Sequence, residues 1–233
     1  MIVSPSRAIS LIEEDRKKVN KRFELLRYVA QRLVEFNFPE EEYLNVKTVK
    51  VSNEKRTVHY ALANEQYYAK CLQEAVNEVK MLDKFNESKR KPDEKTITSV
   101  MKSLVMHFSF ITYMFPRTTL EVIDEDKAET NKRLDMLKYV CQALTRYGIT
   151  ENMYLDMCHN YQYSINTRIK NMVRFVFSSH LDEAYDIATY IENSDFAPYK
   201  SWWDRMFRVQ KMDETMQAML QRMLKLYVFM TNL

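Results

Sequence analysis

The fold is decided by the stretch EEDRKKVNKRFELLRYVAQRLVEFNFPEEEYLN, residues 13–45, which returns 111 positions later as DEDKAETNKRLDMLKYVCQALTRYGITENMYLD, residues 124–156. Thirteen of the 33 aligned pairs are identical and the alignment has no gap. Composition alone would give roughly 2 identities, at about 6% per residue type. A match of this length at a fixed shift indicates a tandem duplication.

Both copies of this stretch have the period of an amphipathic helix. The inward positions of the first copy are Ile12, Val19, Phe23, Leu26, Ala30 and Leu33, and those of the second are Leu134, Leu137, Cys141 and Leu144. Steps of three, four and seven residues keep these side chains on one helical face. We therefore predict helices over about 10–38 and 121–149. Ser10 with Glu13 is typical of a capping-box start, and Pro39 and Gly148 indicate the two ends.

The remaining periodicity predicts an all-α fold of about seven or eight helices in two tandem pseudo-symmetric repeats. The repeats are residues 1–118 and 119–233, and the second carries an insertion at 194–211 with no counterpart in the first. Further helices are expected over about 53–87, 94–114, 151–177, 180–193 and 212–232. Four β-branched valines between residues 46 and 58 also fit a short extended segment or hairpin near 45–60.

Composition excludes several classes of enzyme. The chain has 233 residues and 1 glycine, where average usage of about 7% would give roughly 16. Phosphate-binding loops, dinucleotide fingerprints and nucleophile elbows all require glycine at fixed positions. The one glycine, Gly148, supplies none of them, so the sequence predicts a helical protein with nearly glycine-free connections.

Targeting features are also missing from the sequence. The three cysteines are not in a CxxC spacing and their number is odd, which favours a reducing compartment. Residues 1–10 lack the apolar core of a signal peptide, and the most apolar run, 104–115, is shorter than the roughly 20 residues that span a bilayer. We expect a cytoplasmic protein without a membrane partner.

Metal and catalytic motifs are weak. Asp156 with His159 and His180 with Glu183 have i,i+3 spacing, but neither pair recurs in the first repeat. Cys71 and Cys141 fall on apolar helical faces, where cysteine behaves as a small hydrophobe. The sequence therefore predicts no catalytic, cofactor-binding or metal-binding residues, and we expect a non-catalytic protein without a cofactor. An enzyme ranks third among the alternatives.

Basic residues favour nucleic acid as the alternative ligand. The net charge is +5 for residues 1–118 and −2 for residues 119–233. The candidate phosphate-contacting residues are Arg16, Lys17, Lys18, Lys21, Arg22, Lys47, Lys50, Lys55, Arg56, Lys89, Arg90 and Lys91. The other interpretation is a solvated helix face. Lys21 and Arg22 recur as Lys132 and Arg133, and the helical register predicts that both pairs face outward.

Large apolar side chains favour a protein partner. The chain has 15 methionines, 15 tyrosines and 12 phenylalanines, and methionine-rich and aromatic helices serve adaptable interfaces. The predicted interface residues are Trp202, Trp203, Phe207, Met216, Met219 and Met223. The alternative is that the same helices bury one another inside the chain.

Function is predicted from these surfaces. We expect a structural or assembly protein that works through contacts with other protein subunits, in a homo-oligomer or a larger complex. Abundant Lys, Asn, Tyr, Ile and Phe with scarce Gly are typical of A/T-rich phage and viral genomes, which suggests a virion component such as a ring or connector subunit. The alternative is a nucleic-acid-binding protein of nucleoprotein or packaging type, using the basic residues of the first repeat.

Overall fold

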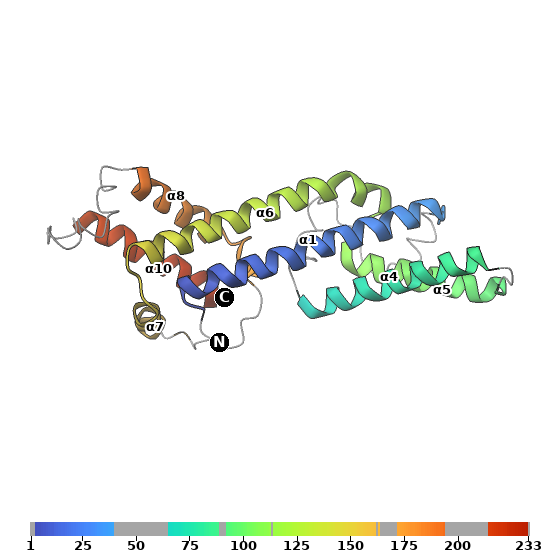
Figure 1. Ribbon diagram of the computed structural model, residues 1–233, viewed down its shortest axis with the longest axis horizontal. Coiled ribbons are helices and arrows are strands. Elements are labelled where there is room, and N and C mark those ends of the chain that lie inside the picture. Colours follow the sequence, from blue (N-terminus) through green and yellow to red (C-terminus); the bar gives the residue numbers. More distant parts are fainter. Residues whose placement is uncertain are drawn as a thin grey trace. The chain divides into compact units, whose positions relative to one another are not determined.

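The computed structural model describes residues 3–39, 65–88, 92–112, 114–161, 163, 172–193 and 214–232. These residues contain no strand, so the all-α class is confirmed. The hairpin expected near 45–60 and the insertion at 194–211 lie outside them. The helices are α1 (Pro5–Glu35), α4 (Glu65–Glu87), α5 (Glu94–Thr112), α6 (Pro116–Arg146), α7 (Glu151–Asn160), the 3-10 helix η1 (Val173–Phe175), α8 (Ser179–Asn193) and α10 (Glu214–Asn232) (Figure 1).

The two long helices, α1 and α6, start in the same way. Each is 31 residues long and begins at a proline, and Pro5 and Pro116 are 111 positions apart. Proline suits the first helical position because its fixed φ is already helical. The N–H that proline lacks would have no acceptor within the helix at this position, so its absence costs no hydrogen bond. The capping-box start predicted at Ser10 is therefore wrong: Ser10 lies inside α1 and its hydroxyl donates 2.9 Å to the carbonyl of Arg7.

The ends of α1 and α6 also correspond. Asn37 (φ 51°) and Gly148 (φ 83°) are the two residues with positive φ in the described part of the chain, again 111 apart. Their amides donate to Val34 (3.0 Å) and Thr145 (3.1 Å), respectively. The amide of Ile149 also donates 3.0 Å to Leu144, which completes a Schellman motif at α6. The predicted helix stop at Gly148 is confirmed.

Replacing Gly148 with alanine is expected to cost about 1–2 kcal/mol of the free energy of unfolding. An added Cβ would meet nothing within 4 Å, so the cost comes from the left-handed backbone alone. Gly148→Asn is the control, because asparagine already holds the equivalent conformation at position 37. Urea unfolding measures both variants. A Gly148→Ala variant as stable as Gly148→Asn would show that the backbone conformation carries no such cost.

The helix predicted over 151–177 is wrong at the described residues that follow α7, which are Tyr161, Tyr163 and residues 172–177. α7 begins after Thr150, whose hydroxyl accepts from the amide of Met153 at 3.3 Å, and it ends at Asn160. Tyr161 is a turn residue, and residues 173–175 form the separate 3-10 helix η1. The end of α7 is marked by the amides of Tyr161 and Tyr163, which donate to the carbonyls of Met157 (3.2 Å) and Cys158 (3.0 Å) and so satisfy groups of the last helical turn.

The described helices form two compact units whose boundaries fall inside α1 and α6. Residues Arg16–Thr130 make one, which we call the α4–α5 unit because α4 packs against α5. Met1–Asp15 and Asn131–Leu233 make the other, the α8–α10 unit, in which α10 packs against α8 and α7. The compact units therefore differ from the sequence repeats, 1–118 and 119–233.

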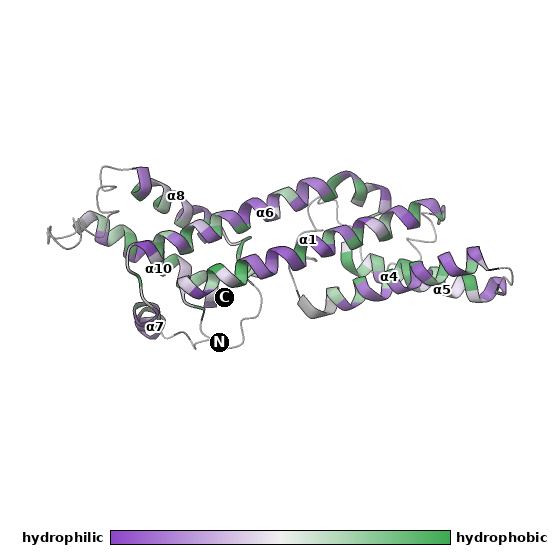
Figure 2. Ribbon diagram, in the orientation of Figure 1, coloured by the Kyte–Doolittle hydropathy of each residue, from purple (hydrophilic) through white to green (hydrophobic). Residues whose placement is uncertain are grey.

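Each unit has an apolar core built from the predicted helical faces. Figure 2 shows hydrophobic and hydrophilic residues alternating along α1 and α6, as the period predicts. In the α4–α5 unit the buried side chains include Phe23, Leu26, Leu72, Val79, Leu104 and Phe108. In the α8–α10 unit they include Ile12, Leu134, Leu137, Leu181, Met223 and Tyr227. The inward positions predicted for both long helices are confirmed.

Candidate protein-binding groove

The α8–α10 unit contains a groove of about 610 Å³ between α7 and α10, which we call the α7–α10 groove. Its α7 wall carries Met153, Asp156, Met157 and Asn160, and its α10 wall carries Gln217, Leu220, Gln221 and Leu224. Tyr147 and Ile149, which follow α6, complete the described lining. Along both walls the residues recur at i, i+3, i+4 and i+7, so each helix lines the groove with one continuous face.

The groove has an apolar floor and a polar rim. Leu220, Leu224 and Ile149 are buried, whereas Met153 stays 44% exposed. Asp156, Asn160, Gln217 and Gln221 are all exposed, at the rim. An amphipathic helix recognises a groove of this kind by placing side chains at i, i+3, i+4 and i+7 on the floor. The arrangement is therefore suited to binding a helix.

Among the described lining residues of the groove, Asp156 is the one that carries a negative charge. The other lining residues are apolar, amide or phenol side chains. The Arg222 guanidinium of α10 pairs with α8: its Nε donates 2.7 Å to the carboxylate of Glu183. This hydrogen bond lowers the pKa of the Glu183 carboxyl below its usual value. The Lys225 ammonium lies 4.8 Å from the ring centre of Tyr161. The groove consequently favours an apolar helix that carries a basic residue beside its apolar face.

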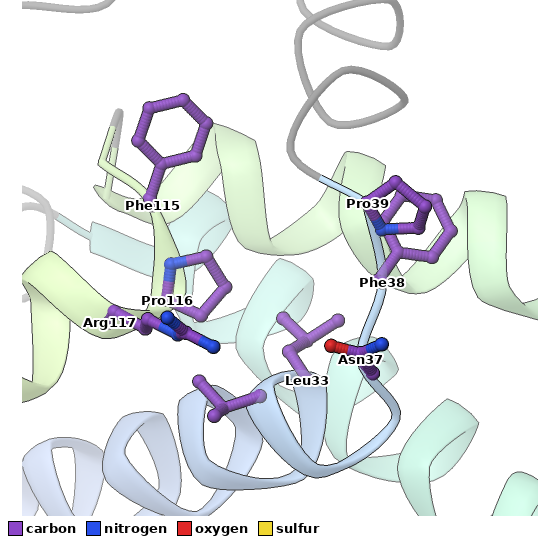
Figure 3. Close-up of a pocket in the computed structure, with 8 residues that line it drawn as sticks. Leu33, Asn37, Phe38, Pro39, Phe115, Pro116 and Arg117 are labelled. Atoms are coloured by element: carbon purple, nitrogen blue, oxygen red, sulfur yellow. The ribbon is translucent and has the colours of Figure 1, made fainter.

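A second cavity, of about 340 Å³, lies in the α4–α5 unit. Figure 3 shows Leu33, Asn37, Phe38 and Pro39 at the end of α1, with Phe115, Pro116 and Arg117 at the start of α6. Val34 completes the lining. These eight residues include one cation and no carboxylate, histidine, cysteine or serine. Among these eight described residues there is thus no acid, base or nucleophile of the kinds that catalytic sites use.

A polar cluster joins α4 to α5. The Ser103 hydroxyl donates to a carboxylate oxygen of Glu78, and the His107 Nδ1 lies 3.0 Å from both oxygens of the same carboxylate. In a catalytic triad the histidine lies between the serine and the acid. Here the acid lies between the other two, so the histidine is not placed to take the serine proton. The cluster of Glu78, Ser103 and His107 therefore links α4 to α5, and we call it the Glu78 clasp.

Two buried thiols, those of Cys141 and Cys158, are not activated. Complete burial raises the pKa of the Cys141 thiol to about 12, so it stays protonated at neutral pH. Burial also raises the pKa of Cys158, and that of its neighbour Tyr154 to about 12. Thiolates are the nucleophilic form of cysteine. Across the described segments, no group of three or more His, Cys, Asp and Glu side chains could hold a metal ion.

The predicted interface residues differ in burial, and three of the six lie outside the described residues. Met216 and Met223 are buried, Met219 is half-buried, and Trp202, Trp203 and Phe207 lie outside the described residues. Met216 and Met223 thus belong to the core of the α8–α10 unit. Sequence reasoning missed Met153 and Met157, although their i,i+4 spacing on a short amphipathic helix was a signal for a shared face.

The predicted phosphate-contacting residues also differ in burial. Lys17, Lys18 and Lys21 are exposed on α1, and Arg16 and Arg22 are half-buried. The others lie outside the described residues: Lys47, Lys50, Lys55, Arg56, Lys89, Arg90 and Lys91. Only the α1 residues are therefore placed together by the described structure.

The repeated basic pair does not face outward as a whole. Lys21 and its counterpart Lys132 are exposed, as predicted. Arg133, the counterpart of Arg22, instead binds within the α8–α10 unit: it donates to the carbonyls of Val176 and Ser178 and to both oxygens of Asp182, at 3.0 and 3.1 Å. It fixes the turn between η1 and α8. The expectation of an outward contact is wrong for Arg133.

Comparison of the chain with family models, with curated proteins and with solved structures finds no match. No helix in the described ranges is both long enough and apolar enough to cross a membrane. Function is therefore inferred from the geometry of the two units.

Proposed function

We propose that this protein is a non-catalytic assembly component that binds other protein subunits through the α7–α10 groove. The observation that carries the proposal is a 610 Å³ groove with buried leucines on its floor, an exposed methionine and a polar rim. Interface centres are enriched in methionine and aromatic residues and are surrounded by polar rims. The cavity in the α4–α5 unit and the Glu78 clasp offer no competing catalytic arrangement.

The partner that fits the groove is α5 of a second copy of the chain. Met106 and Phe110 of α5 are 38% and 36% exposed and one helical turn apart, and the exposed Lys102 precedes them by one more turn. These three residues, at i, i+4 and i+8, form a stripe that we call the α5 face. Its two large apolar side chains suit the leucine floor, and its ammonium group suits the carboxylate of Asp156.

The groove and the α5 face are unlike surfaces of one molecule. Complementary surfaces of this kind favour head-to-tail contacts between copies, because each copy offers the groove to one neighbour and the α5 face to the next. Such contacts close into rings or extend into filaments. The proposed assembly is therefore a homo-oligomer with heterologous contacts.

The finer proposal is a virion component, such as a ring or connector subunit. It rests on the head-to-tail complementarity and on the amino-acid composition, which is poor in glycine and rich in the residues that A/T-rich genomes favour. A reducing compartment belongs to the same proposal, because Cys71, Cys141 and Cys158 are free and buried.

Charge reversal tests the head-to-tail contact. We expect Lys102→Glu or Asp156→Lys alone to weaken self-association about tenfold, because each places like charges opposite one another. The two changes combined in one chain should restore association, since the pair is then reversed and again attractive. Sedimentation velocity over a concentration series measures both effects.

Matched controls separate this contact from general effects of charge. Lys80→Glu reverses an exposed lysine of α4 and should leave the mass in solution unchanged. Met153→Glu should weaken association, whereas Met81→Glu should not, although both methionines are 44% exposed. A chain that stays monomeric at every concentration, or one that responds equally to both members of each comparison, would overturn the proposal.

A second candidate function is nucleic-acid binding through α1. Lys17, Lys18 and Lys21 are exposed within little more than one helical turn, which is a local phosphate-binding stripe. Lys17→Glu with Lys21→Glu would weaken binding to duplex DNA or RNA, reduce its salt dependence and leave self-association unchanged. A filter-binding series at several salt concentrations measures this effect. Binding that persists in this variant would exclude the α1 stripe as the contact.

A further inference from the structure

The compact units and the sequence repeats divide the chain at different residues, and each unit includes one segment of the other repeat. The α8–α10 unit belongs to the second repeat except for residues 1–15 of the first. The α4–α5 unit belongs to the first repeat except for residues 119–130 of α6. Each unit thus contains an N-terminal segment of the long helix that belongs to the other repeat.

In the α8–α10 unit the segment contributed by the first repeat is residues 3–15. Hydrogen bonds and an ion pair join it to the rest of the unit along its length. The Tyr227 hydroxyl donates 2.9 Å to the carbonyl of Val3. The Lys138 ammonium donates 2.8 Å to Glu13, and the amide of Met172 donates to the carboxylate of Asp15. Within the segment Val3, Ala8, Ile12 and Asp15 are buried. This segment is an integral part of the unit.

In the α4–α5 unit the segment contributed by the second repeat is residues 119–130 of α6. Arg27 of α1 pairs with Asp124, and the Lys127 ammonium donates 2.5 Å to Glu24. Within the segment Thr119, Ile123, Asp126 and Thr130 are buried. The two contributed segments are therefore held by the same kinds of contact.

The contacts in the two units are also equivalent under the duplication. A shift of 111 residues converts Glu13 into Asp124 and Arg27 into Lys138. The ion pair Glu13–Lys138 in one unit is thus the counterpart of Asp124–Arg27 in the other. The buried positions correspond in the same way: Ala8 with Thr119, Ile12 with Ile123, and Asp15 with Asp126.

From this exchange we propose that the chain is a fused, helix-exchanged dimer, in which each repeat completes its compact unit with an N-terminal segment of the other repeat's long helix. The surface that receives this segment is an interaction site for a second copy of the repeat, here supplied by the same chain. The exchange is independent of the α7–α10 groove and of the proposed assembly function.

A cleavable connection between the repeats tests the proposal. A protease site flanked by flexible residues is inserted between Met114 and Phe115 of the full chain, which keeps the Thr112–Met114 and Phe115–Thr119 hydrogen bonds within their own fragments. After folding and cleavage, residues 1–114 and 115–233 should elute together in gel filtration and keep the helical circular dichroism of the uncut protein. Two separate species, each still helical, would overturn the proposal.

The dependence of stability on concentration is the second measurement. If the fragments complete each other, unfolding of the cleaved protein is bimolecular, and tenfold dilution lowers its midpoint by roughly 3–6 °C. The uncut insertion protein is the control, and its midpoint should not change with dilution. A midpoint independent of concentration after cleavage would show that each repeat folds alone.

Cross-linking covers the case in which cleavage itself disrupts the protein. Carbodiimide couples amines to carboxylates without a spacer, and we expect it to join Lys127 to Glu24 and Lys138 to Glu13 in the intact chain. Cleavage after coupling should then leave one band under denaturing conditions, with both cross-links identified by mass spectrometry. Two bands without these cross-links would contradict the exchange.

Discussion

Tyr227→Ala is expected to lower the free energy of unfolding by about 3–5 kcal/mol, the largest loss that we expect from a single substitution. The ring is fully buried in the α8–α10 unit, meets Tyr154 edge-on at 5.8 Å and donates its hydroxyl proton to the Val3 carbonyl. Truncation removes the apolar contact, leaves a cavity and strips the carbonyl of its partner. Urea unfolding of the full chain measures the loss.

Two control substitutions separate these contributions. Tyr227→Phe keeps the ring and should cost about 1 kcal/mol, the usual value of one hydrogen bond. Phenylalanine suits this environment, because it keeps the ring that packs against Tyr154. Tyr190→Ala removes a tyrosine that is 60% exposed on α8 and should stay within about 0.5 kcal/mol of the wild type. Equal losses for Tyr227→Ala and Tyr190→Ala would contradict this packing.

Arg133→Met is expected to cost about 1.5–3 kcal/mol, because charge-assisted hydrogen bonds are lost and two backbone carbonyls lose their donor. The guanidinium is only 16% exposed and contacts Val176, Ser178 and Asp182, so it connects α6 to the start of α8. Lysine should not substitute for it, since a single ammonium does not reproduce the planar fork of donors. Urea unfolding measures this loss as well.

Lys132→Met is the control for Arg133→Met. It removes a neighbouring positive charge that is exposed, and it should change the free energy of unfolding by less than about 0.5 kcal/mol. If Arg133→Met left stability unchanged but weakened self-association, the repeated basic pair would be a contact between molecules instead of an internal anchor.

The long helices were predictable because their signals are local and repeated. A single helical face and a shared 111-residue shift located α1 and α6, and the φ of Gly148 matched its predicted role. Their starts were missed because Ser10 and Glu13 resemble a capping box, whereas Pro5 and Pro116 determine where the helices begin. The end of α7 at Asn160 was missed because the apolar period continues in the sequence beyond it and does not mark where a helix stops.

The candidate site was less predictable because it depends on contacts between distant segments. Met216 and Met223 have the composition of an interface, yet they are buried inside their own unit. The α7–α10 groove requires residues near 155 and near 220 to lie side by side, and no sequence period encodes that juxtaposition. The exchange of helix segments is equally non-local: duplication was visible in the sequence, but not which repeat each segment completes.

The proposed helix exchange has an evolutionary consequence for the paired repeats. A free repeat of this kind would need a partner molecule in order to fold, and its stability would fall on dilution. Joining two repeats in one polypeptide replaces that encounter with a high effective concentration, so each half meets its complement at any level of expression. Fusion also ends the requirement that both halves be encoded identically. One repeat can then acquire excess positive charge and the other an aromatic insertion, while the buried residues of the exchanged segments are preserved.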